Sequence, residues 1–465
     1  MIVRRSLVLV SLVAALHGLF FIWYQRPDWS LPYVWPDQDG YRRLGAVLAE
    51  TGRFTRFPDA PRFVPEVIRT PIYPAFVALI YRVFGVHQIP VALAQTGLFV
   101  LICLVVYGIT RRVSGERVAI AAAALTALYP PIPYFGALVM TEVWTTLLFT
   151  VSMWVAIRAL QDRSRGAFAL LGFLLALTTL SRPVFVLFPI ALAATGLVMF
   201  PVLGVSQRPK PRRWAVMLVV FALAMLPWFI YNYATLGRIT LSPAGGIGRG
   251  LWEGSWQATW SGRLQNELTH LADDIDDRAE LDRRVEAIAA REDLPAGPML
   301  EYVHQWEDIR RIWTEPVDSY ERAQARVQAD QEYLRVAIQN IRRDPLSHHV
   351  KRLARGVFVL WAGEIPFRYS EINQLPRIVI RACWAAQAVL FALAMYGVYA
   401  LARSGRHVEA CLLATPIVYI TAGHMLLLTE ARQSLPAQPV LLLLATIGVA
   451  FLLPLKPQVH EREHL

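Results

Sequence analysis

Charged residues are scarce in this 465-residue chain, where Asp, Glu, Lys and Arg together make up 17%, against roughly 25% in an ordinary soluble domain. Apolar residues make up 55% of the chain, and its mean hydropathy is +0.39. This composition argues against a soluble globule and excludes a disordered chain. No short period repeats along the sequence, which excludes a coiled coil or a solenoid.

Several signatures of other protein classes are also missing. The three cysteines, Cys103, Cys383 and Cys411, lie in apolar runs without CxxC spacing, which predicts buried thiols rather than a redox or metal site. The glycines at 245–250 follow no strand pattern, so they form no dinucleotide fingerprint. The net charge of +11 does not indicate nucleic acid, because the basic residues stand beside apolar segments.

Long apolar runs dominate what is present. Runs of about 18 or more apolar residues suffice to cross a bilayer core near 30 Å thick. We therefore predict an all-α polytopic membrane protein with about ten transmembrane helices. They are expected near residues 6–24, 88–110, 118–133, 136–158, 167–181, 183–204, 214–235, 377–402, 408–428 and 435–455. The short apolar stretch 70–85 fits either an amphipathic interfacial helix or an eleventh span.

The distribution of Lys and Arg predicts the orientation, because cytoplasmic loops are rich in both. Alternate short connections are basic, and the others carry at most one arginine. The basic connections contain Arg111, Arg112 and Arg117; Arg158, Arg163 and Arg165; Arg208, Lys210, Arg212 and Arg213; and Arg403 and Arg406. Both termini of this plasma (inner) membrane protein are therefore expected in the cytoplasm, and the N-terminal run is expected to be an uncleaved span.

Two long segments then lie on the extracytoplasmic side. We expect an N-terminal transmembrane module, 1–235, whose first extracytoplasmic loop is 25–87. A small, mainly helical extracytoplasmic domain is expected over 236–376, followed by C-terminal transmembrane helices over 377–465. The charged stretch 273–292 within the middle domain is expected to be a solvated helical face.

Five charged residues are expected at the outer membrane face, in four different connections: Asp37, Asp39, Glu142, Arg182 and Arg432. Ionisable residues this close to hydrocarbon usually have a partner or a function. Arginine presents a planar fork that suits phosphate oxygens, so this set fits an anionic substrate. Structural roles remain as alternatives, namely a helix N-cap for one aspartate, an ion pair for Glu142 and snorkelling for the arginines.

Short motifs follow one another in a definite order through the membrane part. They are Asp37-Gln38-Asp39-Gly40-Tyr41, Arg69-Thr70-Pro71-Ile72-Tyr73-Pro74, Thr141-Glu142, Leu180-Ser181-Arg182-Pro183, and Arg432 before Pro436. Their order and common sidedness resemble the GT-C fold membrane glycosyltransferases. The resemblance is strongest to the bacterial protein-mannosyltransferase and aminoarabinose-transferase-like (glycosyltransferase family 39-like) group.

This resemblance implies a hexosyl- or pentosyltransferase of the cell envelope. Such an enzyme takes a sugar from a polyprenyl-phosphate carrier at the outer face and passes it to a lipid, glycan or protein acceptor, and in-line displacement predicts inversion. By this resemblance Asp37 matches the acidic residue regarded as catalytic, because it stands four residues before the tyrosine, and Asp39 is the second candidate. Many relatives carry a second acidic residue directly after the first, where this chain has Gln38, so the division of labour between Asp37 and Asp39 stays open. The expected substrate-binding residues are Tyr41, Arg69, Glu142, Arg182 and Arg432.

Other functions stay open at this point. A transporter or flippase of lipid-linked precursors would also need many helices and arginines near phosphate, although no inverted repeat relates the two halves. A non-catalytic scaffold is a third possibility. No ligand spacing requires a cofactor, but the outer acidic residues are able to bind a divalent cation. Membrane lipids are expected partners and nucleic acid is not.

Overall fold

A computed structural model describes residues 2–26, 36–205, 209–314, 316–372, 374–425 and 427–453. Within these ranges the regular secondary structure is entirely helical, and no strand occurs. This confirms the predicted all-α class. Three parts of the expected topology lie outside the described residues: the start of the first extracytoplasmic loop, 27–35; Arg208 of one basic connection; and the C-terminal end, 454–465.

Seven helical segments among the described residues are long and apolar enough to cross a membrane, which agrees with a multi-pass protein. Five of them are single helices, one is a series of short helices, and one is a short 3-10 turn continued by an α-helix. They are α1 (Ile2–Gln25), α4 (Gln88–Ser114), α7 (Glu142–Asp162), the series η1 (Pro183–Leu187), α9 (Phe188–Ala194), η2 (Thr195–Met199) and α10 (Phe200–Val202), α11 (Pro211–Leu236), α19 (Arg377–Arg403), and η3 (Ala431–Ala437) with α21 (Gln438–Leu452).

The other three expected spans are also helical but shorter or less apolar, so the total of about ten spans stays a prediction. They correspond to α5 (Glu116–Leu128), α8 (Arg165–Thr179) and α20 (His407–His424). The expected span at 118–133 stops before Pro130, and a separate short helix, α6 (Pro131–Gly136), follows. Consecutive prolines remove backbone donors and so interrupt a continuous helix here.

The stretch 70–85 forms the 13-residue helix α3 (Ile72–Phe84). At 1.5 Å per residue, a helix of this length falls well short of a bilayer core of about 30 Å. Its buried side carries Tyr73 and Val77, whereas Leu79 and Val83 are exposed. This amphipathic arrangement favours the interfacial alternative over an eleventh span.

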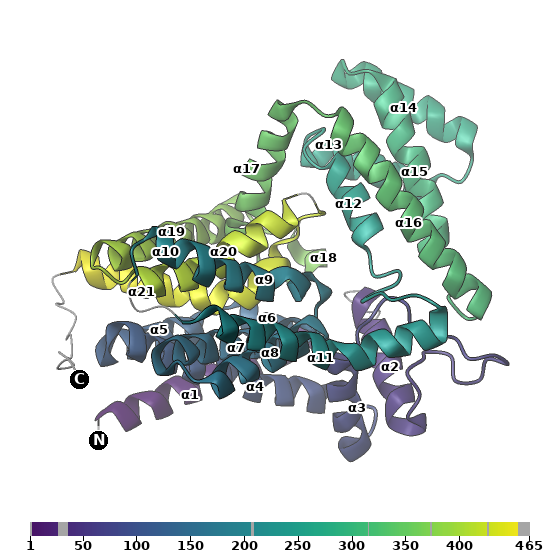
Figure 1. The fold of residues 1–465 in the computed structure, drawn as a ribbon. Coiled ribbons are helices and arrows are strands. Elements are labelled where there is room, and N and C mark those ends of the chain that lie inside the picture. The colour runs from purple at the N-terminus through teal and green to yellow at the C-terminus, as the bar shows by residue number, and fades with distance from the viewer. Residues whose placement is uncertain are drawn as a thin grey trace.

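Three of the four predicted basic connections are joined by contacts at one end of the helical bundle. The Arg112 guanidinium donates to Gln161 at the end of α7 (3.0 Å), and Arg406, between α19 and α20, donates to the backbone oxygen of Arg112 (3.5 Å). The N-terminal end of α1 and the C-terminal end of α21 also lie at this end (Figure 1). The bundle therefore has a basic end, as the alternation of charge in the sequence predicts.

A helical domain projects from the other end of the bundle (Figure 1). It consists of α12 (Ile247–Trp256), α13 (Gly262–Asp274), α14 (Arg278–Glu292), α15 (Ala296–Thr314), α16 (Tyr320–Arg343) and α17 (Leu346–Ala362), and the short α18 (Tyr369–Ile372) leads back to α19. Its core includes Trp252, Leu268, Val285 and Val303. This domain has an apolar core of its own. The division of the chain at residues 236 and 376 stays a prediction.

Candidate active site

Helix α2 (Pro36–Thr51) sets the position of Asp37. Pro36 opens the helix, a position that suits proline because the first turn needs no backbone donor. Asp37 lies in the first turn, where the helix dipole favours a carboxylate. The next residue, Gln38, is buried and donates to Gln88 of α4 at 2.9 Å, which fixes α2 against the bundle. The Asp37 side chain itself is 46% exposed and is therefore accessible to a ligand.

Arg432 contacts acidic residues from two distant parts of the chain and a third acid two residues away. Its Nη2 lies 3.3 Å from Oδ2 of Asp37, and its Nη1 lies 3.5 Å from Oε1 of Glu142. Its Nε donates to Glu430 at 2.8 Å. These contacts join the first residues of α2 and α7 to the start of η3, at the end of the bundle opposite the basic connections.

Arg69 reaches the same site from the segment before α3. Its Nη2 donates to the backbone oxygen of Asp37 at 3.3 Å and lies 3.7 Å from the carboxylate oxygen Oδ1 of that residue. The guanidinium crosses α2 at Gly40, where an added Cβ would overlap it. It also lies over the ring of Tyr41, 4.8 Å from the centroid, an attractive cation–π arrangement.

Glu142 and Arg182 complete the cluster. The Glu142 side chain is only 1% exposed, and its Oε1 lies 3.7 Å from Nη2 of Arg182. Arg182 stands in extended backbone before Pro183, which starts η1; a residue before proline is disfavoured from helix. Several buried atoms of the cluster have no hydrogen-bond partner among the described residues, namely Oε2 of Glu142, Nη1 of Arg182, and Nε and Nη1 of Arg69. Buried polar groups are normally paired, so these atoms favour a ligand at this place.

Electrostatics keep Asp37 ionised in this arrangement. Partial burial on its own would raise the pKa of the carboxyl group, but the guanidinium groups of Arg432 and then Arg69 outweigh it and hold the pKa below its usual value. Burial instead raises the pKa of Tyr41 to about 12, so its hydroxyl stays protonated at neutral pH. The site therefore offers the ionised Asp37 carboxylate beside several fixed cations.

Six of the seven residues singled out from the sequence meet in this cluster, and Asp39 does not. Asp39 is two residues beyond Asp37, which places it on a different face of the helix. Its carboxylate pairs with Arg43 one turn later at 3.0 Å, and the Arg43 side chain is 64% exposed. The described contacts thus give Asp39 a local helix ion pair rather than a place beside Arg432.

Three further acidic residues belong to the surroundings of the site. Glu66 is buried and pairs with Arg56 at 2.7 Å and with Arg69 at 3.8 Å. Glu430 caps η3 and pairs with Arg432. Glu364, between α17 and α18, interacts electrostatically with Arg432 and Glu142, and burial raises the pKa of its carboxyl group to about 8. Glu142 was singled out from the sequence because it is an acidic residue expected at the outer membrane face. The same criterion would have pointed to Glu364, which follows an amphipathic stretch expected on that side.

A metal ion has no ready-made ligand set in the described part of the chain, where no group of three His, Cys, Asp or Glu side chains converges. Arginines separate the two acids of the cluster instead, as the contacts of Arg432 with Asp37 and Glu142 illustrate. The predicted ability of the outer acidic residues to bind a divalent cation stays a prediction.

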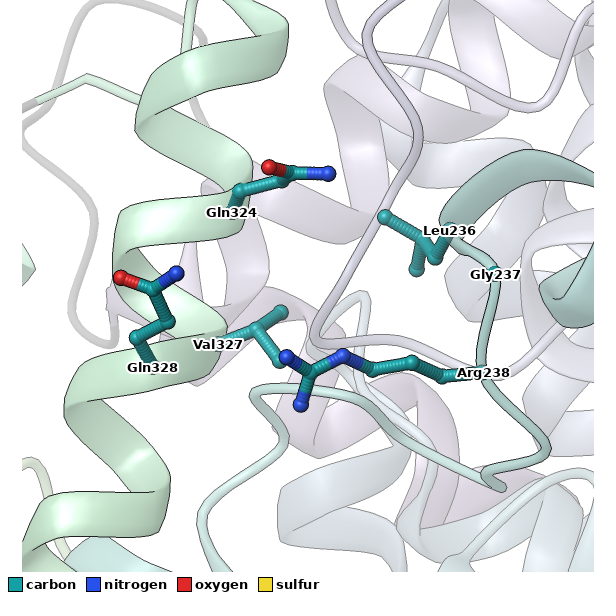
Figure 2. A pocket seen from close by; sticks show the side chains of 6 residues that line it. All are labelled: Leu236, Gly237, Arg238, Gln324, Val327 and Gln328. Atoms are coloured by element: carbon teal, nitrogen blue, oxygen red, sulfur yellow. The ribbon is translucent and has the colours of Figure 1, made fainter.

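A pocket of about 170 Å³ lies elsewhere, between the end of α11 and α16 (Figure 2). Figure 2 shows Gln324, Val327 and Gln328 of α16 opposite Leu236, Gly237 and Arg238. None of these residues belongs to the cluster around Arg432.

Known sequences and structures show what the chain is similar to. Residues 68–231 match the pattern of the dolichyl-phosphate-mannose-protein mannosyltransferase family. This stretch holds Arg69, Glu142 and Arg182, whereas Asp37 and Arg432 lie outside it. A search of curated protein sequences finds no match.

Solved structures extend the similarity to nearly the whole chain. The archaeal oligosaccharyltransferase AglB from Archaeoglobus fulgidus, in complex with an inhibitory peptide and a dolichol-phosphate, superposes with a TM-score of 0.54 at 14% identity over 96% of this chain. The apo form of the A. fulgidus enzyme gives 0.57 at 16% identity over 97%. This chain covers about half of the length of these enzymes, 50% and 51%.

A weaker likeness is to ArnT from Cupriavidus metallidurans bound to undecaprenyl phosphate, with a TM-score of 0.40 at 14% identity, covering 93% of this chain and 77% of ArnT. The family match and the oligosaccharyltransferase superpositions cover overlapping parts of the same helical bundle. Together they identify this chain as a multi-pass membrane protein with the fold of the GT-C glycosyltransferases.

Proposed function

We propose that this protein is a membrane glycosyltransferase that moves a sugar from a polyprenyl-phosphate donor to a lipid, glycan or protein acceptor at the extracytoplasmic face. The observation that carries the proposal is the meeting of Asp37, Arg69, Glu142, Arg182 and Arg432 at the end of the bundle opposite the basic connections. Anionic lipid carriers need cations at the membrane boundary, and a transferase needs a carboxylate beside them.

The arginines are suited to the carrier phosphate. As the bond between the sugar and the phosphate breaks, its electron pair moves to the phosphate oxygen, and negative charge grows there. Fixed guanidinium groups directed at that oxygen stabilise the charge without reorganising. The unpartnered Nη1 of Arg182 and the forked contacts of Arg432 supply such donors.

Asp37 is suited to act as the general base. The acceptor hydroxyl oxygen forms a new bond to the sugar carbon opposite the leaving phosphate, and its proton passes to the Asp37 carboxylate. Attack opposite the leaving group inverts the anomeric configuration. Asp39 is assigned to its helix ion pair with Arg43 rather than to catalysis.

Donor binding also adjusts the strength of this base. Without substrate, Arg432 and Arg69 lower the pKa of Asp37, which makes it a weak base. A carrier phosphate bound to Arg432 competes for the same guanidinium and partly neutralises it. The proton affinity of Asp37 then rises when the donor is in place, which favours proton transfer during the reaction.

The test compares Asp37→Asn with Asp39→Asn in membranes supplied with a polyprenyl-phosphate sugar. Loss of a general base should lower transfer by about 10²- to 10⁴-fold, whereas the Asp39 variant should stay within a few-fold of the parent. Released polyprenyl phosphate distinguishes an enzyme from a flippase, which moves the donor unchanged. Normal transfer by a stably folded Asp37→Asn protein would overturn the assignment. If Asp39→Asn instead showed the loss of about 10²- to 10⁴-fold, the general base would be reassigned to Asp39.

A further inference from the structure

The segment that leads into Arg432 is attached to the helical domain. The backbone nitrogen of Leu428 donates to the oxygen of Gly250 in α12 at 2.7 Å. The next residue, Thr429, is held through both of its backbone groups by the side-chain amide of Gln257. Its N–H donates to Oε1 at 3.2 Å, and its carbonyl accepts from Nε2 at 3.4 Å.

Gln257 is built rigidly into the domain. It follows the last residue of α12 and is 7% exposed. Arg352 of α17 donates to the backbone oxygens of Ser255 and Gln257. Ala258, the next residue, has a φ of 65°, which places an alanine in the left-handed region that favours glycine. Backbone outliers of this kind persist where the surroundings enforce them, often beside a functional site.

Thr429 is linked in turn to the cluster. Glu430 follows it and caps η3 through a reciprocal pair of hydrogen bonds with Gln433. The Glu430 carboxylate accepts from Nε of Arg432 at 2.8 Å, which leaves both terminal nitrogens of that guanidinium directed at Asp37 and Glu142. A shift of the Thr429 backbone would therefore displace Glu430 and turn the Arg432 fork.

We propose that Gln257 is a positioning residue, which holds Thr429 so that Arg432 is directed at Asp37, and that the helical domain thereby controls the geometry of the active site. This inference rests on the proposed function. Gln257 touches neither Arg432 nor Asp37 in the described contacts, so its effect is expected to be indirect.

The experiment uses the full-length protein with Gln257→Met, which keeps the side-chain length and removes both hydrogen bonds. Because a displacement near 1 Å can cost up to about 10²-fold in rate, turnover at saturating polyprenyl-phosphate sugar should fall about ten- to a hundredfold. Gln324→Met is the matched control, because Gln324 is exposed on α16 and, among the described residues, its side chain bonds to Tyr320 one turn away and to no other. Its turnover should stay at the parent level.

A double-mutant cycle separates positioning from general destabilisation. If Gln257 acts through Arg432, adding Gln257→Met to Arg432→Lys should lower turnover less than about twofold further. Losses that multiply in the double variant would overturn the proposal. Gln257→Glu, which keeps the acceptor for the Thr429 N–H and loses the donor, serves if the methionine variant does not fold, and it should give the same non-additive result.

Amide hydrogen exchange tests the contact without using activity. The Thr429 N–H should exchange about tenfold faster or more in Gln257→Met than in the parent or in Gln324→Met, because its acceptor is gone. Unchanged exchange would refute the proposal. The two hypotheses fail separately: full transfer by Asp37→Asn removes the proposed function, whereas parent-level turnover in Gln257→Met with inactive Asp37→Asn removes only the positioning role.

Discussion

At the scale of single residues, the site combines charges that would each be costly alone. Glu142 is nearly fully buried, yet Arg182 and Arg432 lie 3.7 and 3.5 Å from its Oε1. A buried carboxylate without such partners would lose its hydration without compensation. The same pairing fixes two guanidinium groups at the place where, under the proposed function, an anionic ligand binds.

The paired state of Asp37 predicts a specific pH response for Arg432→Gln. In the parent, Arg432, Arg69 and Arg182 lower the pKa of Asp37, and partial burial raises it. Glu142 and Glu430 share Arg432 with it. Removing Arg432 leaves burial less opposed, so the pKa of Asp37 should rise. The base must be ionised in the free enzyme, so the acidic limb of kcat/KM should move to higher pH.

This shift is measured from the pH profile of sugar transfer, normalised to the maximum of each variant. Arg43→Gln provides the comparison, because Arg43 pairs with Asp39 and not with Asp37. Its acidic limb should coincide with that of the parent. An Arg432→Gln profile with an unmoved limb would mean that Asp37 is not the titrating base.

At the scale of elements, close approach at glycine determines how Arg69 enters the site. The arginine crosses α2 at Gly40, where a Cβ would overlap the guanidinium. The Asp-Gln-Asp-Gly-Tyr motif therefore has two effects. It places a carboxylate at the start of the helix, and its glycine leaves room for the Arg69 guanidinium to cross the helix from the segment before α3.

Gly40→Ala should therefore lower sugar transfer about ten- to a hundredfold, the range expected when a binding group is displaced by about 1 Å. Gly97→Ala in α4 is the control, because a Cβ at Gly97 meets nothing within 4 Å and alanine is a better helix former than glycine by up to about 1 kcal/mol. Transfer assays and thermal melting of both variants check this. Full activity of Gly40→Ala would show that the position of Arg69 is not critical.

At the scale of the whole molecule, the two ends of the bundle carry different sets of charged residues. One end gathers the basic connections, through contacts such as Arg406 to Arg112. The other carries the acid–arginine cluster and the helical domain. Because cytoplasmic loops are enriched in Lys and Arg, the basic end is expected in the cytoplasm and the cluster at the extracytoplasmic face.

Cysteine labelling in intact cells tests this orientation. A membrane-impermeant thiol reagent should label Gln328→Cys, exposed on α16, from outside. Ser404→Cys, exposed in the basic turn after α19, should be labelled only after the membrane is permeabilised. The parent chain gives the background from its three cysteines. The reverse pattern would place the cluster in the cytoplasm.

The sequence by itself determined the helical class and the candidate residues of the site. Apolar runs have few alternatives to helices in a bilayer, where backbone groups need internal partners. The alternation of basic connections likewise separated the residues into two ends, so Asp37, Glu142, Arg182 and Arg432 were predicted together without knowledge of any contact. The number of spans was less certain, because prolines such as Pro130 and Pro131 divide apolar stretches into short helices.

Only the tertiary structure decided which of these charges meet. The family resemblance ranked Asp37 ahead of Asp39, but the residues alone could not separate them, because both stand in the first turn of α2. The packing of that helix gives Asp37 to Arg432 and Asp39 to Arg43. The sequence also could not indicate that Gln257 holds Thr429, since a contact between residues 172 positions apart leaves no local pattern. Periodicity encodes which side of an element is buried, whereas long-range pairing depends on how whole elements pack.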